Sequence, residues 1–279
     1  MKTKIFAVAI VLLLALFNVA SAYEVYWIGA GEPGNSPPWN YGPGEDVYWS
    51  NGNNWVKWPA DAGWVPTLGV PTAADTIHLN RPGYPILVNT GTAGVGAVLN
   101  VGYWADHSLE VTGGSIAIGG DISVGIGGTD NDGLLTVSGG LISAGGAFAV
   151  GGDNPWSGTG ATGLLDMSDG AINVVGNLQI GKYAISTGTV NLSGGIITAA
   201  SIEMTANGLL DITGTGKVVL LGDQTVLVGG YIGSGWISGQ ANYMTSGEYT
   251  GNTLITVPEP VTLFLLGVGG LIISRRRKG

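Results

Sequence analysis

Residues 135–151 read Leu-Thr-Val-Ser-Gly-Gly-Leu-Ile-Ser-Ala-Gly-Gly-Ala-Phe-Ala-Val-Gly, and this short unit decides the fold. It holds three apolar segments, each followed by glycine. In the first segment, Leu135 and Val137 alternate with polar residues, as in a strand with one buried face. The second carries Ile142 and Ala144, and the third is Phe148–Val150. A unit this small cannot hide its own apolar face, so it needs stacked copies of itself.

Copies of the unit recur at intervals of 23 to 30 residues. Their third segments start at Leu99, Ile122, Phe148, Leu178, Ile202 and Val226. Coaxial stacking would place equivalent strands about 4.8 Å apart, which predicts an all-β parallel β-helix, a solenoid of about six coils with three parallel sheets around an apolar bore. No long stretch free of glycine has helical periodicity, so no helix is expected here. The alternative is an antiparallel β-sandwich, because strands this short also pair antiparallel.

The polar positions of the first segments would form one outward column in such a coil. The column consists of Glu110, Thr136, Asp166, Asn191 and Asp211, in which acids mostly alternate with neutral residues. Adjacent carboxylates about 4.8 Å apart would repel. The alternation is therefore what an in-register stack tolerates.

The composition excludes several kinds of chemistry. The chain has 279 residues with 51 Gly, 45% hydrophobic and 10% charged residues, no Cys, and two histidines, His78 and His107. The absence of Cys excludes disulfides, thiolate metal sites and Cys nucleophiles. Two isolated histidines make most catalytic triads unavailable, and each is expected to be a hydrogen-bonded surface or turn residue.

The N-terminus is typical of a secretory signal peptide spanning residues 1–22. Lys2 and Lys4 precede the apolar run 5–17, and the small residues Ala20 and Ala22 flank Ser21. We expect cleavage after Ala22. The run of thirteen apolar residues is shorter than the roughly 20 that a membrane-spanning helix needs.

The C-terminus, residues 257–279, has three parts in a fixed order. Pro258-Glu259-Pro260 is followed by the apolar run 261–273 and by the basic residues Arg275, Arg276, Arg277 and Lys278. This order resembles the PEP-CTERM sorting signal of Gram-negative bacteria, whose signature tripeptide matches Pro258, Glu259 and Pro260. The resemblance implies export through the secretion translocon, a transmembrane intermediate in the inner membrane, cleavage by an exosortase, and delivery to the cell surface or a biofilm matrix. By the positive-inside bias, the basic cluster would remain cytoplasmic.

Without these two ends, the exported part is strongly acidic. Between Tyr23 and Thr256 there are eighteen acidic and four basic residues, a net charge of −14. Such a charge disfavours nucleic acid and anionic polysaccharide as partners. It favours neutral glycans such as exopolysaccharide, or divalent cations, and no cofactor is implied.

Six of the nine tryptophans lie in residues 23–83, ahead of the repeats at 84–250. The stretches 49–55 and 69–77 resemble the entry segment that precedes β-helical passenger repeats in bacterial surface proteins. We interpret residues 23–83 as an N-terminal cap that covers the open bore and the unpaired strand edge. The alternative is a tryptophan platform on which sugar rings stack.

Aromatic residues also follow the third segments, where one corner of the coil would present them together. These candidate glycan contacts are Tyr103, Trp104, Trp156, Tyr183 and Tyr231. Variable loops on one edge of a solenoid are usual binding surfaces. We therefore predict a neutral-glycan contact edge on a structural or adhesive protein.

Acidic residues offer weaker candidates. Asp130, Asp132 and Asp153 lie in loops that have the density of carboxylates, but not the full ligand set, of a calcium site. The competing function is a carbohydrate-active enzyme, a polysaccharide lyase or glycosidase, by analogy of fold alone. Its nearest candidate residues are Asp166, Asp169 and Lys182. We expect that this protein is not an enzyme.

Overall fold

The computed structural model describes residues 23–27, 48–52, 55–59, 67–79, 85–103, 106–126, 132–152, 160–183 and 185–257. These residues form an all-β protein with two large, mostly parallel sheets and one short helix. The expected signal-cleavage residues Ala20 and Ala22, the Pro258-Glu259-Pro260 tripeptide and the arginines of the tail lie outside the described residues. Within those ranges, no helix is long and apolar enough to cross a membrane.

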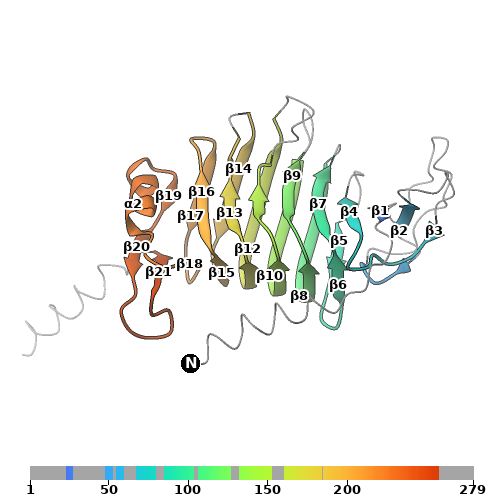
Figure 1. Ribbon diagram of the computed structural model, residues 1–279, viewed down its shortest axis with the longest axis horizontal. Coiled ribbons are helices and arrows are strands. Elements are labelled where there is room, and N and C mark those ends of the chain that lie inside the picture. The colour runs from blue at the N-terminus through green and yellow to red at the C-terminus, as the bar shows by residue number, and fades with distance from the viewer. Residues whose placement is uncertain are drawn as a thin grey trace, which may run out of the picture.

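The first sheet contains the third segments of the repeats. Its nine strands run in the order β16 (Ser201–Met204), β13 (Asn177–Ile180), β11 (Phe148–Val150), β9 (Ile122–Ile126), β7 (Val98–Tyr103), β4 (Thr76–Leu79), β1 (Tyr23–Trp27), β2 (Trp55–Pro59) and β3 (Thr67–Leu68). The strands from β16 to β1 pair in parallel, whereas β2 and β3 pair antiparallel. The strands therefore follow one another along the long axis of the molecule (Figure 1).

The second sheet contains the first and second segments. Its twelve strands are β5 (Ile86–Val88), β6 (Ala93–Gly96), β8 (His107–Ile118), β10 (Asp132–Ala144), β12 (Thr162–Val174), β14 (Thr187–Leu192), β15 (Ile196–Ala199), β17 (Gly208–Ile212), β18 (Lys217–Leu221), β19 (Ile237–Ser238), β20 (Gln240–Tyr243) and β21 (Asn252–Thr256). The pairing is parallel except for β21, which pairs antiparallel with β18 and β20.

The number of sheets differs from the three that the sequence predicts. In β8, β10 and β12 the first and second segments join into a single strand, so the two expected sheets are one. The register between β8 and β10 shifts on either side of Gly139, where the joined strand is irregular. The glycine pair therefore makes an irregularity within a continuous strand, and the hydrogen-bonded ladder continues past it.

The outward column of the first segments is in register. Thr136 is opposite Glu110 on one side and Asp166 on the other, and Asn191 lies between Asp166 and Asp211. The Asn191 amide donates a hydrogen bond to Asp166 Oδ1 (2.6 Å), and the Ser238 hydroxyl donates to Asp211 Oδ1 (2.5 Å). The neutral residues Thr136 and Asn191 thus separate the carboxylates along this ladder, and Ser238 follows its last carboxylate.

Asn191→Asp is expected to lower the free energy of unfolding by about 1 kcal/mol at pH 7, because it places three carboxylates on adjacent strands and removes the amide donor. Urea denaturation measures the loss, and high salt should recover part of it. The matched control is Asn191→Ser, which removes the amide without adding a charge. Equal stability of the Asp and Ser variants at low salt would argue against the ladder.

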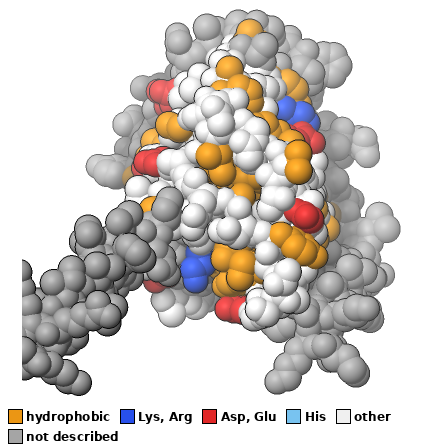
Figure 2. Space-filling view, turned by 90° about the vertical axis from the view of Figure 1, so that its left-hand side faces the viewer, with side chains coloured by type: hydrophobic (Ala, Val, Ile, Leu, Met, Phe, Trp, Pro, Cys, Tyr) orange, Lys and Arg blue, Asp and Glu red, His pale blue; other side chains and the backbone are white. Residues whose placement is uncertain are grey.

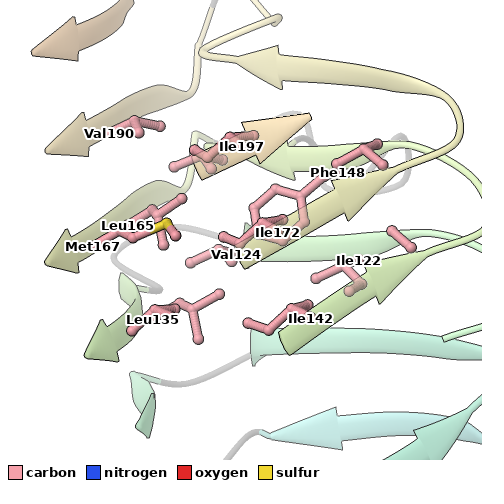
Figure 3. Packing of buried hydrophobic residues seen from close by; sticks show 14 of the residues in the cluster. Ile122, Val124, Leu135, Ile142, Phe148, Leu165, Met167, Ile172, Val190 and Ile197 are labelled. Carbon is pink, nitrogen blue, oxygen red and sulfur yellow. The ribbon is translucent and has the colours of Figure 1, made fainter. Parts of the chain in front are cut away.

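The core lies between the two sheets and consists of inward columns contributed by every repeat. Leu109, Leu135, Leu165, Val190 and Leu210 occupy equivalent positions on successive strands and are buried. Ile122 and Phe148 of the first sheet point into the same interior, where Ile142 and Ile172 of the second sheet lie beside them (Figure 3). This burial confirms the inward columns that the alternating pattern predicts.

Four third segments, those of the strands β7, β9, β11 and β13, are followed by a glycine whose backbone closely approaches a first segment: Gly102, Gly125, Gly151 and Gly181. Gly125 has φ +72°, and a Cβ built there would lie 2.1 Å from the carbonyl oxygen of Thr162. A Cβ on Gly163 would lie 2.1 Å from the nitrogen of Gly151 and 2.2 Å from the oxygen of Val124. These corners have no room for a side chain.

Three tryptophans of residues 23–83, Trp27, Trp49 and Trp55, are buried at one end of the molecule. Trp27, Trp49 and Trp55 are at most 1% exposed, and Trp55 lies 5.0 Å from Trp27 and 4.9 Å from Trp49 between ring centroids. The indole nitrogen of Trp55 donates to the carbonyl oxygen of Trp49 (2.8 Å). These three rings pack against one another, so none of them offers a free face to a sugar.

The last expected strand, starting at Val226, is wrong: residues Thr225–Gly233 form the helix α2. No further repeat follows to pair with a strand here, and a helix satisfies its own backbone groups. Gln224, the residue before α2, holds the start of the helix against the previous repeat. Its side-chain amide donates to the carbonyl oxygen of Ala200 (2.6 Å) and accepts from the Ser201 hydroxyl (2.9 Å). The helix thus begins near the start of β16, the last strand of the first sheet, and packs against β19 and β20 (Figure 1).

Candidate functional site

The face of the nine-stranded sheet that points away from the core carries a row of aligned residues, one from each of its seven parallel strands. The row runs Tyr26, His78, Asn100, Ser123, Ala149, Gln179 and Glu203 through the parallel register. The residues that flank these positions, such as Ile77 and Leu99, are buried in the core, so the row points away from it. The middle of the row is itself buried, since His78, Asn100, Ser123 and Ala149 are at most 9% exposed. Charged and aromatic side chains gather at the two ends of the row.

The first end is a cluster around His78, which we call the His78 cluster (Glu24, Tyr26, His78, Asn100 and Tyr103). His78 is 5% exposed and its Nε2 contacts the Glu24 carboxylate. The Asn100 amide lies 3.3 Å from His78 Nδ1. These two contacts are satisfied when Asn100 donates to Nδ1 and Nε2 donates to Glu24.

Two tyrosines enclose the imidazole of this cluster. Tyr26 stacks on His78 with ring centroids 5.0 Å apart and an interplanar angle of 21°, and Tyr103 lies 4.2 Å away at 37°. Burial, and then the nearby Glu24 carboxylate and Tyr103, raise the pKa of Tyr26 to about 12. Both ring nitrogens of His78 are engaged, so its chemistry here is to hold Glu24 and the tyrosines in place.

The second end is a cluster around Glu203, which we call the Glu203 cluster (Asn177, Gln179, Lys182, Tyr183 and Glu203). Glu203 accepts from Lys182 Nζ (2.9 Å), Asn177 Nδ2 (2.6 Å) and Gln179 Nε2 (3.2 Å). The hydrogen bond between Glu203 and Lys182 is the main cause that lowers the pKa of the carboxyl and raises that of the amine. The ion pair is about 36–39% exposed on each side, so solvent screens it.

The candidate glycan contacts divide between these clusters and other places. Tyr103 ends β7 within the His78 cluster, and Tyr183 follows β13, 40% exposed, with Lys182 Nζ 5.8 Å from its ring centroid. Tyr231 is not at this corner: it lies in α2 and stacks on Trp236 at 5.6 Å, because the segment before it is a helix. Trp104 and Trp156 lie outside the described residues.

Sequence reasoning missed most of the residues in the two clusters. Glu24 and Tyr26 lie 54 and 52 positions before His78, their contact in this cluster, so no local pattern brings them together. The available signal was the polar position in the middle of each third segment, which Asn100, Gln179 and Glu203 share. Aligning those positions places them in a single row.

The acidic candidates do not converge on one site. Asp166 accepts from Asn191 on the second sheet, Asp169 accepts from the nitrogen of Gly170 (2.7 Å), and Lys182 pairs with Glu203 on the first sheet. Of the calcium candidates, Asp132 starts β10, while Asp130 and Asp153 lie outside the described residues. Among the residues that are described, no three His, Asp or Glu side chains gather where they could hold a metal ion.

The expectation of surface or turn histidines is wrong in both cases. His78 is hydrogen-bonded but buried, and His107 starts β8 and is 5% exposed. Among the residues that the structure describes, neither ring nitrogen of His107 has a hydrogen-bond partner. In the register of the second sheet His107 is opposite Gly133, so a large ring replaces glycine in this repeat. Burial lowers the pKa of His107 to about 4.

Stability should therefore depend on pH through His107. Because its folded-state pKa of about 4 is below the ordinary 6.5, the unfolded chain takes up a proton first as pH falls. This linkage removes roughly 3 kcal/mol of stability between pH 6.5 and 4. His107→Leu, which cannot be protonated, should lose less stability over that interval when urea unfolding is measured at pH 7 and pH 4.5. The same loss in both proteins would show that His107 does not cause it.

Comparison of the whole chain with protein-family models, with curated proteins and with solved structures gives no match.

Proposed function

We propose that the chain is an exported β-solenoid that serves as a structural or adhesive protein of the cell surface or extracellular matrix. The observation that carries the proposal is the parallel, in-register pairing of equivalent strands from repeat to repeat. Repetition of this kind produces length and a lateral surface. Many weak contacts along such a surface can give high avidity without any single strong site.

The sorting part of the proposal rests on the two ends of the sequence. The signal-like residues 1–22 would direct the chain to the translocon, and Pro258-Glu259-Pro260 with its apolar and basic continuation would direct it to an exosortase. Replacing the three residues by alanine should leave the precursor unprocessed, so that it stays in the membrane fraction of its host at its larger size. Unchanged processing would overturn the sorting proposal.

The ligand that fits the exposed features best is a neutral polysaccharide. Each cluster holds its charges in internal contacts, Glu24 with His78 and Glu203 with Lys182, while Tyr183 presents an exposed ring. Aromatic faces suit the apolar faces of sugar rings. The net charge of −14 between Tyr23 and Thr256 opposes an anionic polymer.

Binding of neutral and anionic polysaccharides to the immobilised protein tests this proposal. Tyr103→Ala combined with Tyr183→Ala should weaken binding of the neutral polymers at least about tenfold, since both aromatic contacts are lost. The matched control is Tyr243→Ala, because Tyr243 is 43% exposed but belongs to β20 in the other sheet. Binding that survives the double substitution, and survives it again when Trp104 and Trp156 are also replaced, would refute the assignment.

A further inference from the structure

The helix α2 is apolar on all sides but is mostly exposed. Its sequence, Thr-Val-Leu-Val-Gly-Gly-Tyr-Ile-Gly, has no charged residue, and Val228 is its one buried side chain. Val226 is 92% exposed and Leu227 is 42% exposed. A helix that is hydrophobic all round is normally enclosed by protein or lipid. We therefore expect the exposed side of α2 to contact another molecule or a lipid surface.

Other apolar side chains lie at the same end of the molecule. Leu221, at the end of β18, is 54% exposed, and Tyr243, on the strand β20 that packs against α2, is 43% exposed. We call these two residues, together with Val226 and Leu227, the α2 face. Hydrophobic side chains are spread over the middle of this end of the molecule (Figure 2). An exposed group of this kind marks an interaction surface more often than a scatter of single residues does.

The chain leaves the described structure at this same end. β21 ends at Thr256 and pairs with β20, which in turn packs against α2. Four residues, 257–260, separate Thr256 from Val261, the first residue of the apolar run 261–273. An extended chain from Thr256 to Val261 reaches at most about 18 Å. If the apolar run enters a bilayer, the end of the molecule that carries the α2 face is held close to the lipid surface.

The length of the apolar run strengthens this constraint. Thirteen residues in a helix span about 20 Å, less than the roughly 30 Å hydrocarbon core. A short span is accommodated by thinning of the bilayer or by drawing its flanking residues inward. Further apolar contact beside the span would stabilise such an arrangement, and the α2 face lies where that contact is available.

We propose that the α2 face rests on the lipid bilayer while the C-terminal segment is inserted, so that the end of the repeat stack is a membrane-contact surface of the sorting intermediate. This inference rests on the proposed membrane insertion of residues 261–273. Val226 and Leu227 would enter the boundary between headgroups and acyl chains, as in other interfacial helices. The repeats would then extend away from the membrane along the long axis of the molecule (Figure 1).

The absence of native cysteine permits a direct test on the full chain. Val226→Cys, labelled with an environment-sensitive fluorophore, is reconstituted in phosphatidylcholine nanodiscs that contain lipids with a nitroxide near the headgroup. The control is Thr112→Cys, exposed on β8, which lies five strand spacings, or about 24 Å, from β19 along the second sheet. Leu266→Cys, within the apolar run, reports insertion of that run with a nitroxide placed deep in the acyl chain.

The expected result is quenching at position 226 at least about twofold stronger than at 112, because an interfacial side chain lies about 5–10 Å inside the boundary region. Quenching at 266 without quenching at 226 would overturn the inference and leave the proposed anchoring intact. Lack of quenching at 266 would overturn the anchoring itself. A label at position 226 that is shielded from water in the absence of lipid would also overturn the inference, because protein would then cover the α2 face. Shielding that increases with protein concentration would identify a second copy of the chain, and shielding that does not would identify the chain's own C-terminal segment.

Discussion

Gly163→Ala is expected to lower the free energy of unfolding by about 3 kcal/mol or more, or to prevent folding altogether. The added Cβ would lie 2.1 Å from the nitrogen of Gly151 and 2.2 Å from the oxygen of Val124. Both contacts are with backbone, so no side-chain rotation relieves them. Relief requires the end of β9 and the start of β12 to separate, which breaks the corner that holds neighbouring repeats together.

Gly152→Ala is the matched control for this substitution. The nearest atom to a Cβ at position 152 is 3.6 Å away, an ordinary van der Waals distance. The two variants therefore make the same chemical change in the same corner of the molecule, and they differ in the space available. Urea denaturation should show Gly152→Ala within about 1 kcal/mol of the parent protein. Equal stability of the two variants would contradict the close packing of these corners.

Phe148→Ala is the second substitution with a large expected effect, a loss of about 3–5 kcal/mol. Phe148 is fully buried, and its strand neighbours in the stack are Ile122 on one side and Leu178 on the other. It lies among side chains of both sheets (Figure 3). Truncation leaves a cavity that the paired strands above and below cannot close without breaking their hydrogen bonds.

The column that contains Phe148 supplies the control. Its neighbours are branched aliphatic residues, so Phe148→Leu fits the pattern of the column and should cost about 1.5 kcal/mol or less. The difference in free energy of unfolding between the Ala and Leu variants, measured by urea or thermal unfolding, gives the cost of the cavity. A loss below about 1 kcal/mol for Phe148→Ala would show that position 148 does not lie in a packed core.

The local pattern of the repeats was enough to predict the strands and their buried columns. Alternation at Leu135 and Val137 identifies the buried face, and the recurrence of this pattern places Asp166 beside Thr136 and Asn191. These features depend on residues close in sequence or at a fixed interval. The same recurrence placed Tyr103 at the end of β7 and Tyr183 just after β13, two equivalent strands of one sheet.

Features that depend on an interrupted repeat could not be predicted in this way. The segment at Val226 has the residues of a third strand, and it becomes a helix because no later repeat pairs with it. His107 stands where the next repeats have glycine, and nothing in its neighbours along the chain shows that it is buried. The contact of His78 with Glu24 joins residues 54 positions apart, across the whole entry segment.

The most direct test of the central claim, parallel and in-register stacking of the repeats, is disulfide cross-linking between introduced cysteines. Asp166 and Asn191 are aligned on adjacent strands about 4.8 Å apart, within the range that a disulfide spans. Asp166 and Asp211 are two strand spacings apart, about 9.6 Å, which is beyond that range. The account predicts that, under mild oxidation, the folded protein with cysteines at 166 and 191 forms the intramolecular bond and the protein with cysteines at 166 and 211 does not. Cross-linking of the second pair without the first would contradict it.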